Sequence, residues 1–171
     1  FRVPAEQVKL FNLKDPETRD AFLDKIASRN DDRLLRICRT ACEHIELMTL
    51  KLEQEAEKAV AGKPRAEHPL LVISMGGSGS GKSIVTDYIR KLTHSLRDEN
   101  YVFTGLDDYR KESGLYQMMQ AVGHHSDDYS LVEPYANTLR SWVADKAIER
   151  SLNILYDGSA IPYKGRYDKL I

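Results

Sequence analysis

The chain has 171 residues and a formal net charge of −1. This length fits one domain or a small domain with an appendage, and the near-neutral charge supplies no bulk positive field for nucleic acid or an anionic membrane. The charge therefore gives no reason to expect a nucleic-acid partner. No apolar run is long enough to span a bilayer and no signal peptide is recognisable, so we expect no membrane partner either. Because the chain starts at Phe1 rather than Met, we expect it to be a processed or excised piece.

The first part of the chain, residues 1–62, is predicted to be an all-helical N-terminal region. A short helix is expected over Ala5–Leu13. The segment Asp15-Pro16-Glu17 then combines a capping residue with proline at the first helical position. It predicts a second helix that ends near Asn30.

A longer helix is predicted next, capped by Asp31 or Asp32 and reaching about Ala61. Its apolar residues recur three and four positions apart, as expected of one buried face: Leu34, Ile37, Cys38, Ala41, Ile45, Met48 and Leu52. We expect this helical region to pack on the rest of the chain as an appendage. A docking surface for a partner or an inhibitor is the alternative.

Two cysteines, Cys38 and Cys42, lie four residues apart on one face of this helix. A metal site needs two further ligands nearby, and His44 lies off that face. We therefore expect reduced thiols packed in a core, which suits a reducing compartment.

A polar segment with two prolines, residues 63–69, is predicted to be the linker to a second domain over residues 70–171. Leu70–Met75 is a short apolar run typical of a buried strand. A glycine-rich loop follows at once. It matches the phosphate-binding pattern G-x-x-x-x-G-K-[ST] at every fixed position, over the residues Gly76, Gly77, Ser78, Gly79, Ser80, Gly81, Lys82 and Ser83.

Each residue type in this loop has a physical role. Glycines allow backbone N–H groups to converge on a phosphate, and the first turn of the following helix adds further N–H groups and the positive end of its dipole. We expect the loop to bind ATP, with Lys82 on the β- and γ-phosphates and the Ser83 hydroxyl on Mg²⁺. A turn rich in glycine and serine that binds nothing is the alternative.

After the loop, a helix to about Arg97 and a second buried strand over Tyr101–Leu106 are expected. The strand leads directly to Asp107, and in open parallel sheets ligands bind beyond the carboxyl ends of the strands. Asp107 is therefore a candidate catalytic base for a substrate hydroxyl, and Arg110 is a candidate substrate contact. The alternative is a solvated acidic cap of the next helix.

A short helix over Gly114–Val122 and a helix over Leu131–Arg150 are predicted in the following part of the chain. The loop between them contains His124 and His125. Adjacent histidines in a loop are weak ligands as a pair, so we expect no metal site there.

A third strand, over Leu152–Tyr156, leads to Asp157. An apolar strand that ends on a carboxylate resembles a Walker-B position. Asp157 is therefore a candidate ligand of Mg²⁺ or a residue that orients the substrate, and Ser159 is a candidate substrate contact. Lys164 and Arg166 are either phosphate contacts or part of a solvated tail.

Together these elements predict an α/β fold, a three-layer P-loop NTPase or kinase with a parallel sheet, preceded by the helical region. Three strands can be counted where a doubly wound sheet of this type has about five. We expect the strand before the glycine loop to lie at an exposed edge. We also expect C-terminal strands to be missing from this chain, or another segment to complete the sheet.

From Leu70 to Ser159 the chain resembles the zeta toxin family of P-loop kinases. The resemblance lies in the segment VISMGGSGSGKS, in D-x-Y-R at Asp107–Arg110 with Tyr116 six residues later, in ANTLRSWVADKAIERS and in the strand NILYDGS.

The chain departs from the family pattern in three places. It has Asp157-Gly158-Ser159 where Glu-Gly-Thr is typical, and Ser113-Gly114 where His-Pro is common. Ser141 stands in the place of a glutamate that binds substrate in the family.

The resemblance implies an ATP-dependent kinase that phosphorylates a hydroxyl of a small nucleotide-containing metabolite. Zeta toxins phosphorylate UDP-N-acetylglucosamine and related nucleotide sugars, and similar type III effectors of plant pathogens phosphorylate NAD. By this match Lys82 and Ser83 carry the phosphate and Mg²⁺ roles, Asp107 is the base, and Arg110 lies on the substrate side.

The resemblance also implies a toxin or an injected effector, acting in the cytoplasm or secreted into a host cell. A small helical antitoxin or inhibitor protein is the implied partner. A housekeeping nucleoside or small-molecule kinase is one alternative, and a non-catalytic ATP-binding interaction module is another.

Overall fold

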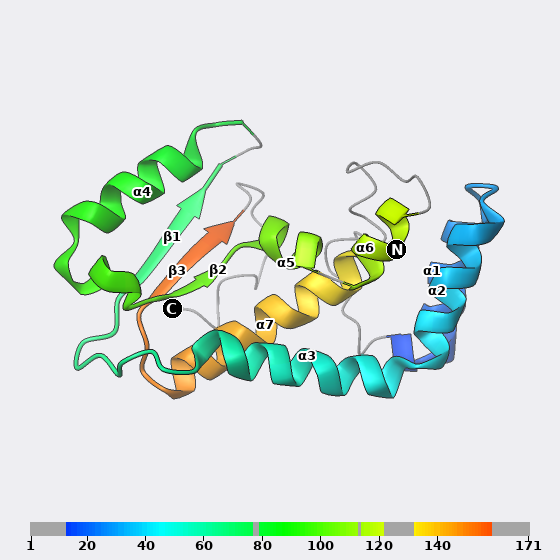
Figure 1. Ribbon diagram of the computed structural model, residues 1–171, viewed down its shortest axis with the longest axis horizontal. Coiled ribbons are helices and arrows are strands. Elements are labelled where there is room, and N and C mark those ends of the chain that lie inside the picture. Colours follow the sequence, from blue (N-terminus) through cyan, green and yellow to red (C-terminus); the bar gives the residue numbers. More distant parts are fainter. Residues whose placement is uncertain (1–12, 77–78, 113, 122–131, 159–171) are drawn as a thin grey trace. The chain divides into compact units, whose positions relative to one another are not determined.

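The computed structural model describes residues 13–76, 79–112, 114–121 and 132–158 (Figure 1). The chain groups into two units. Unit 1 comprises Phe1–Glu55 and Leu106–Arg140, and unit 2 comprises Ala56–Gly105 and Ser141–Ile171. The domain boundary expected at residues 63–69 stays a prediction. Within the described ranges, every helix is too short or too polar to cross a membrane.

Unit 1 is built from helices. They are α1 (Pro16–Ala27), α2 (Asp32–Glu43), most of α3 (Ile45–Val60), α5 (Leu106–Glu112), α6 (Gly114–Ala121) and the first half of α7 (Glu133–Glu149). The predicted caps of the first two helices are present. Asp15 accepts a hydrogen bond of 2.9 Å from the Thr18 N–H, and Asp31 accepts bonds from the N–H groups of Arg33 and Leu34.

The single long helix predicted after Asp31 is wrong, because the chain breaks it at His44 into α2 and α3. His44 leaves the helical region, with φ −103° and ψ 28°. The break lets each helix bury its own stripe of residues that lie four positions apart. In one straight helix of this length such a stripe would turn gradually around the axis, because a helix has 3.6 residues per turn. The buried residues are Leu34, Cys38 and Cys42 in α2, and Leu52, Ala56 and Val60 in α3.

The core of unit 1 contains Ile26, Leu34, Cys38 and Val132, all almost fully buried. Cys38 and Cys42 are both buried free thiols, which confirms the prediction of reduced cysteines in a core. Burial raises the pKa of Cys38 to about 12, and the neighbouring Cys42 adds to this shift. Burial also raises the pKa of Cys42.

The free energy of unfolding is expected to fall as pH rises above about 8.5, the pKa of a thiol in an unfolded chain. Above that pH the unfolded chain has released the proton of Cys38 while the folded chain still holds it up to about pH 12. The unfolded state therefore binds fewer protons, and stability declines with pH. Urea unfolding at several values between about pH 7 and pH 10 measures the slope. Cys38→Ala should flatten that slope, and an equal slope in both proteins would contradict the prediction.

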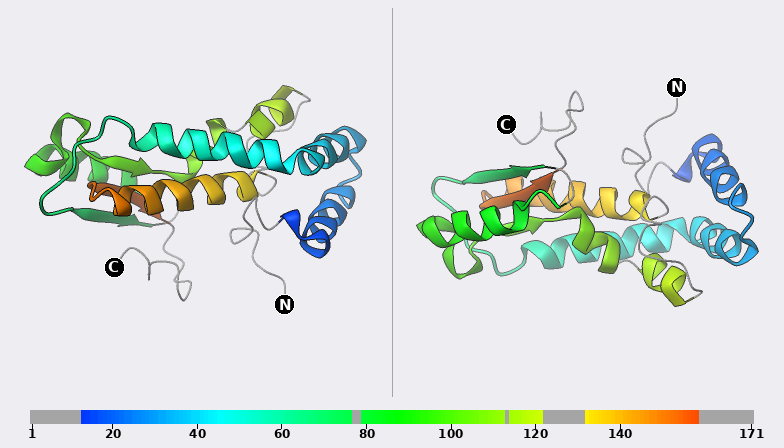
Figure 2. Two further views of the ribbon diagram at one scale, coloured as in Figure 1. Left: turned by 90° about the horizontal axis from the view of Figure 1, so that it is seen from below. Right: turned by 90° about the horizontal axis from the view of Figure 1, so that it is seen from above.

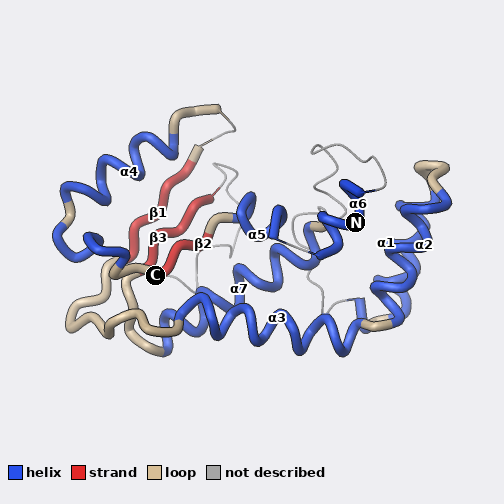
Figure 3. The backbone as a smooth tube through the Cα atoms, viewed as in Figure 1, coloured by secondary structure: helices blue, strands red, loops and turns tan. Residues whose placement is uncertain are grey.

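Unit 2 contains a parallel sheet of β1 (Leu71–Met75), β2 (Val102–Thr104) and β3 (Ile154–Gly158), in the order β1-β3-β2 (Figure 3). All three strands were predicted, with shifts of one to two residues at most ends. The glycine loop lies between β1 and α4 (Lys82–Leu92). This is the α/β fold of a P-loop kinase with a partial sheet. Within the described ranges, β1 pairs only with β3 and forms an edge, as expected.

One face of the sheet lies toward α4, which runs alongside the strands (Figures 1 and 2). Side chains alternate along a strand, so Phe103, Leu155 and Asp157 share this face. Leu96, Tyr101 and Leu155 form the buried cluster on it, and Leu70 and Val72 pack against that cluster.

The helix after the glycine loop is shorter than predicted, because it ends at Leu92 and not near Arg97. Thr93 is extended, with φ −91° and ψ 110°, and a 3-10 helix, η3 (His94–Glu99), follows. Four apolar residues of this helix are exposed in the structure: Ile84, Val85, Tyr88 and Leu92.

Asn153, immediately before β3, joins three segments of unit 2. Its side-chain oxygen accepts from the Leu70 N–H at 2.9 Å. Its side-chain nitrogen donates to the carbonyl groups of Ser95 and Asn100 at 2.9 and 3.0 Å. Asn153 is only 5% exposed, so water cannot easily replace these bonds.

Asn153→Ala is expected to lower the free energy of unfolding by about 2–4 kcal/mol, because the buried side chain of Asn153 makes three hydrogen bonds that alanine cannot make. Urea unfolding followed by circular dichroism measures the change. Asn100→Ala is the matched control, since it removes an amide side chain and keeps the backbone carbonyl that Asn153 uses. A loss of the same size in both variants would contradict the assignment.

Candidate functional site

The glycine loop and the start of α4 form the first part of the candidate site. Gly81 is the N-cap of α4 with φ +83°, and Gly79 has φ +74°. Both values lie in the left-handed region that favours glycine. At Gly76 a Cβ would lie 2.5 Å from the Ser80 Oγ, so the loop closes tightly around this glycine. Gly77 and Ser78 lie outside the described residues.

Lys82 is the first residue of α4 and reaches back over the loop. Its Nζ donates a hydrogen bond to the Gly76 carbonyl at 2.8 Å. Because Gly81 has no side chain to cap the helix, the N–H groups of the first turn can bind an anion at the positive end of the helix dipole. The loop, the helix start and the lysine are therefore arranged for a phosphate group.

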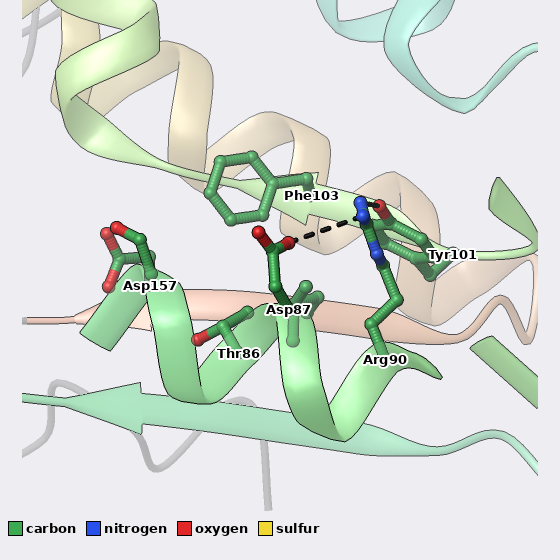
Figure 4. A pocket seen from close by; sticks show the side chains of 8 residues that line it. Thr86, Asp87, Arg90, Tyr101, Phe103 and Asp157 are labelled. Atoms are coloured by element: carbon green, nitrogen blue, oxygen red, sulfur yellow. Dashed lines mark hydrogen bonds and ion pairs between the residues drawn. The ribbon is translucent and has the colours of Figure 1, made fainter. Parts of the chain in front are cut away.

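Ser83 and Asp157 line the same cavity in unit 2. Figure 4 shows Asp157 at one end of it. Asp157 lies in β3 opposite Ser74 of β1, and the Ser74 hydroxyl donates to Asp157 Oδ1 at 2.8 Å. This bond holds the carboxylate from the neighbouring strand. A hydroxyl and a carboxylate are the hard oxygen donors that Mg²⁺ prefers, so the residues present fit this ion.

The cavity has a volume of about 220 Å³ and lies between α4 and the sheet. Its lining comes from α4 (Ser83, Thr86, Asp87 and Arg90), from β2 and the residue before it (Tyr101 and Phe103) and from β3 (Leu155 and Asp157). Arg90 forms an ion pair with Asp87 at 3.3 Å and donates to the Tyr101 hydroxyl at 2.8 Å.

Asp107 and Arg110 lie in α5, in unit 1, whereas the glycine loop and Asp157 lie in unit 2. The guanidinium group of Arg110 forms an ion pair with Asp107 Oδ1 at 2.6 Å. The Asp107 side chain is mostly exposed, whereas the Arg110 side chain is 17% exposed. The expected strand end is wrong here, since β2 ends at Thr104 and α5 begins at Leu106. Gly105 interrupts the strand, and acids in the first turn favour the start of a helix.

Several residues singled out in the sequence lie outside the described residues: His124, His125, Ser159, Lys164 and Arg166. Among the described residues, no group of three or more His, Cys, Asp and Glu side chains is placed to hold a metal ion. Ser83 and Asp157 are only two protein donors. In P-loop enzymes two are enough, because the nucleotide phosphates supply further oxygens to the metal ion.

Sequence reasoning missed two features of this site. The first is Ser74, which orients Asp157, and its only signal was a polar residue inside the apolar run before the glycine loop. The second is the set of cavity residues Asp87, Arg90 and Phe103. Thr86, Asp87 and Arg90 interrupt the apolar pattern of α4 at helical spacing, which is the signal that marks them in retrospect.

Comparison with known proteins places this geometry in context. A family model described as "Zeta toxin" matches residues 53–161, which is more than half of the chain. This match confirms the resemblance inferred from the sequence. No curated protein matches the chain.

Among solved structures, the fold is similar to a chain of the PezAT chromosomal toxin-antitoxin system of the human pathogen Streptococcus pneumoniae. The TM-score is 0.52 and the sequence identity is 21%, over 66% of this chain and 45% of that chain. The present chain therefore spans less than half the length of that protein. At this level of identity the likeness shows the fold alone.

Proposed function

We propose that this chain, which belongs to the zeta toxin family, carries the phosphate-binding part of an ATP-dependent kinase. The enzyme transfers the γ-phosphoryl group to a hydroxyl of a small nucleotide-containing metabolite, NAD or a UDP-amino sugar. One observation carries the proposal: a glycine loop between β1 and α4, with Ser83 and Asp157 on one cavity beside it.

In this proposal the loop residues bind and orient the triphosphate. The N–H groups of the loop and of the first turn of α4 bind the phosphates, and Lys82 exchanges the Gly76 carbonyl for phosphate oxygens. Ser83 and Asp157 would hold Mg²⁺, which neutralises charge on the transferred group when bound. Ser74 keeps the Asp157 carboxylate in one orientation.

Asp107 is proposed as the catalytic base that accepts the proton of the substrate hydroxyl. Its exposed carboxylate is within hydrogen-bond distance of Arg110, which orients it. Arg110 and Ser159 are proposed substrate contacts, together with Asp157. Proton removal by Asp107 and phosphate binding by Lys82 then divide the reaction between two separate elements of the chain.

A toxin or an injected effector is the proposed biological role, acting in the cytoplasm or after secretion into a host cell. The similar solved structure belongs to a toxin-antitoxin system, which supports a partner of the same kind here. We propose a small helical antitoxin or inhibitor protein as that partner.

The test is phosphoryl transfer from γ-labelled ATP to a panel of metabolites, with the protein incubated with Mg²⁺ and with Lys82→Ala as the blank. The panel contains UDP-N-acetylglucosamine, NAD, nucleosides and nucleoside monophosphates. A labelled nucleotide sugar or labelled NAD supports the proposal and selects its acceptor. Labelled nucleosides would instead assign a housekeeping kinase, and bound ATP with no labelled metabolite would favour an ATP-binding interaction module.

A further inference from the structure

The cavity between α4 and the sheet has properties that phosphate binding alone does not use. It extends from Ser83 and Asp157 along α4 to Arg90 and Tyr101. Figure 4 shows the Phe103 ring reaching from β2 toward α4, opposite Asp87, with Asp157 at one end and the Arg90 and Tyr101 contact at the other.

The size of the cavity limits its occupant. Its volume of about 220 Å³ is below the roughly 300–1,000 Å³ of sites that enclose a whole small ligand. It fits one ring and not an entire nucleotide-containing metabolite. The rest of such a ligand must lie outside this cavity.

One wall of the cavity is an aromatic ring. Phe103 is 37% exposed, whereas its strand neighbours Val102 and Thr104 are buried. A solvent-accessible phenylalanine that faces a cavity supplies a stacking surface, and every planar heteroaromatic ring has a complementary face.

Away from the Ser83 and Asp157 end, which is proposed above for Mg²⁺ and the triphosphate, the charges of the cavity argue against a phosphate as the occupant. Among the described lining residues, Arg90 is the cation, and it is bound to Asp87 and to the Tyr101 hydroxyl. Asp87 is the acid in this part of the cavity, because Asp157 is assigned to Mg²⁺ in the proposed function. Carboxylates accept hydrogen bonds, so they favour an uncharged or cationic ring that carries N–H donors.

We propose that this cavity binds a planar heteroaromatic ring of the acceptor, such as a nucleobase or a nicotinamide. The ring stacks on Phe103, and Asp87 accepts a hydrogen bond from its N–H group. The assignment of this ring to the acceptor rests on the proposed kinase function. The binding of a ring in the cavity does not rest on it. Phe103 and Asp87 are then specificity-determining residues.

The experiment measures ring binding directly by saturation-transfer NMR on the full chain, with uridine, adenosine and nicotinamide riboside as probes. Saturation of the ring protons of at least one probe is expected in the unmodified protein. Phe103→Ala and Phe103→Leu should weaken binding of that probe by about tenfold or more, and Phe103→Tyr should retain it. Tyr88→Ala is the control, since it removes an exposed aromatic ring of α4 outside the cavity lining.

Steady-state kinetics then assigns the ring to acceptor or to ATP. Phe103→Ala should raise the KM of the acceptor identified by the panel about tenfold and leave the KM of ATP unchanged. A raised KM for ATP alone, ring binding that persists in Phe103→Ala, or no binding of any probe would overturn the inference. A third outcome separates the two proposals. If Phe103→Ala loses ring binding but the unmodified protein transfers no label from ATP to any metabolite, the ring site is supported and the kinase function is rejected.

Discussion

Lys82→Ala is expected to lower phosphoryl transfer by about a thousandfold or more and to weaken ATP binding by about tenfold or more. Lys82 places its ammonium group over the glycine loop, where Nζ is 2.8 Å from the Gly76 carbonyl. In the proposed mechanism this charge binds the β- and γ-phosphates and stabilises the charge that develops during transfer. Its removal therefore affects the transition state more than it affects the bound ATP.

The measurement combines kcat/KM with γ-labelled ATP and the Kd of ATP by isothermal titration calorimetry. Lys91→Ala is the matched control, because Lys91 is an exposed lysine in the last turn of the same helix. It should change either value by less than about twofold. Transfer that stays within about tenfold of the unmodified protein in Lys82→Ala would remove Lys82 from the mechanism.

The parts of the fold that could be predicted are those in which local sequence and tertiary packing agree. The apolar runs of β1 and β3 have no competing helical periodicity, so their positions were correct to within two residues. The caps Asp15 and Asp31 act within a few residues of themselves, and both are present.

The errors occur where tertiary packing decides between local alternatives. Nothing in the residues around His44 forbids a continuous helix, and the break follows from the separate faces that α2 and α3 bury. At Leu106 a strand and a helix are both compatible with the local sequence. The start of α5 moves Asp107 from a strand end into a helical first turn.

The exposure of α4 has a similar origin. The apolar pattern of this helix predicts burial, yet Ile84 and Tyr88 are 77% and 64% exposed. Doubly wound sheets are covered on both faces and continue past their nucleotide-binding strand. In the described ranges β1 is an edge strand, so the pattern of α4 fits a larger sheet than these residues form.

The candidate site also has residues that could be predicted from the sequence and residues that could not. The glycine loop was recognisable because the backbone alone dictates its residue types, as the positive φ values of Gly79 and Gly81 illustrate. The Ser74 and Asp157 bond depends on the strand register and joins residues 83 positions apart. A single sequence does not contain that register, so the positioning role of Ser74 was not predicted.

Asp107→Asn is expected to reduce phosphoryl transfer about a hundredfold or more while ATP binding stays unchanged. Asparagine has nearly the same shape and can still accept a hydrogen bond from Arg110, but its amide cannot accept the proton of a substrate hydroxyl. The Asp107 side chain is 67% exposed, so we expect a change in the free energy of unfolding below about 0.5 kcal/mol. A lower rate would then report chemistry and not unfolding.

Asp108→Asn is the matched control, because both acids lie in the first turn of α5 and the substitution changes the net charge equally. It should alter the rate by less than about threefold. Equal rates in Asp107→Asn and Asp108→Asn would assign the base to another residue. The proposed roles of Lys82 and Ser83 would be unaffected, because they depend on the glycine loop alone.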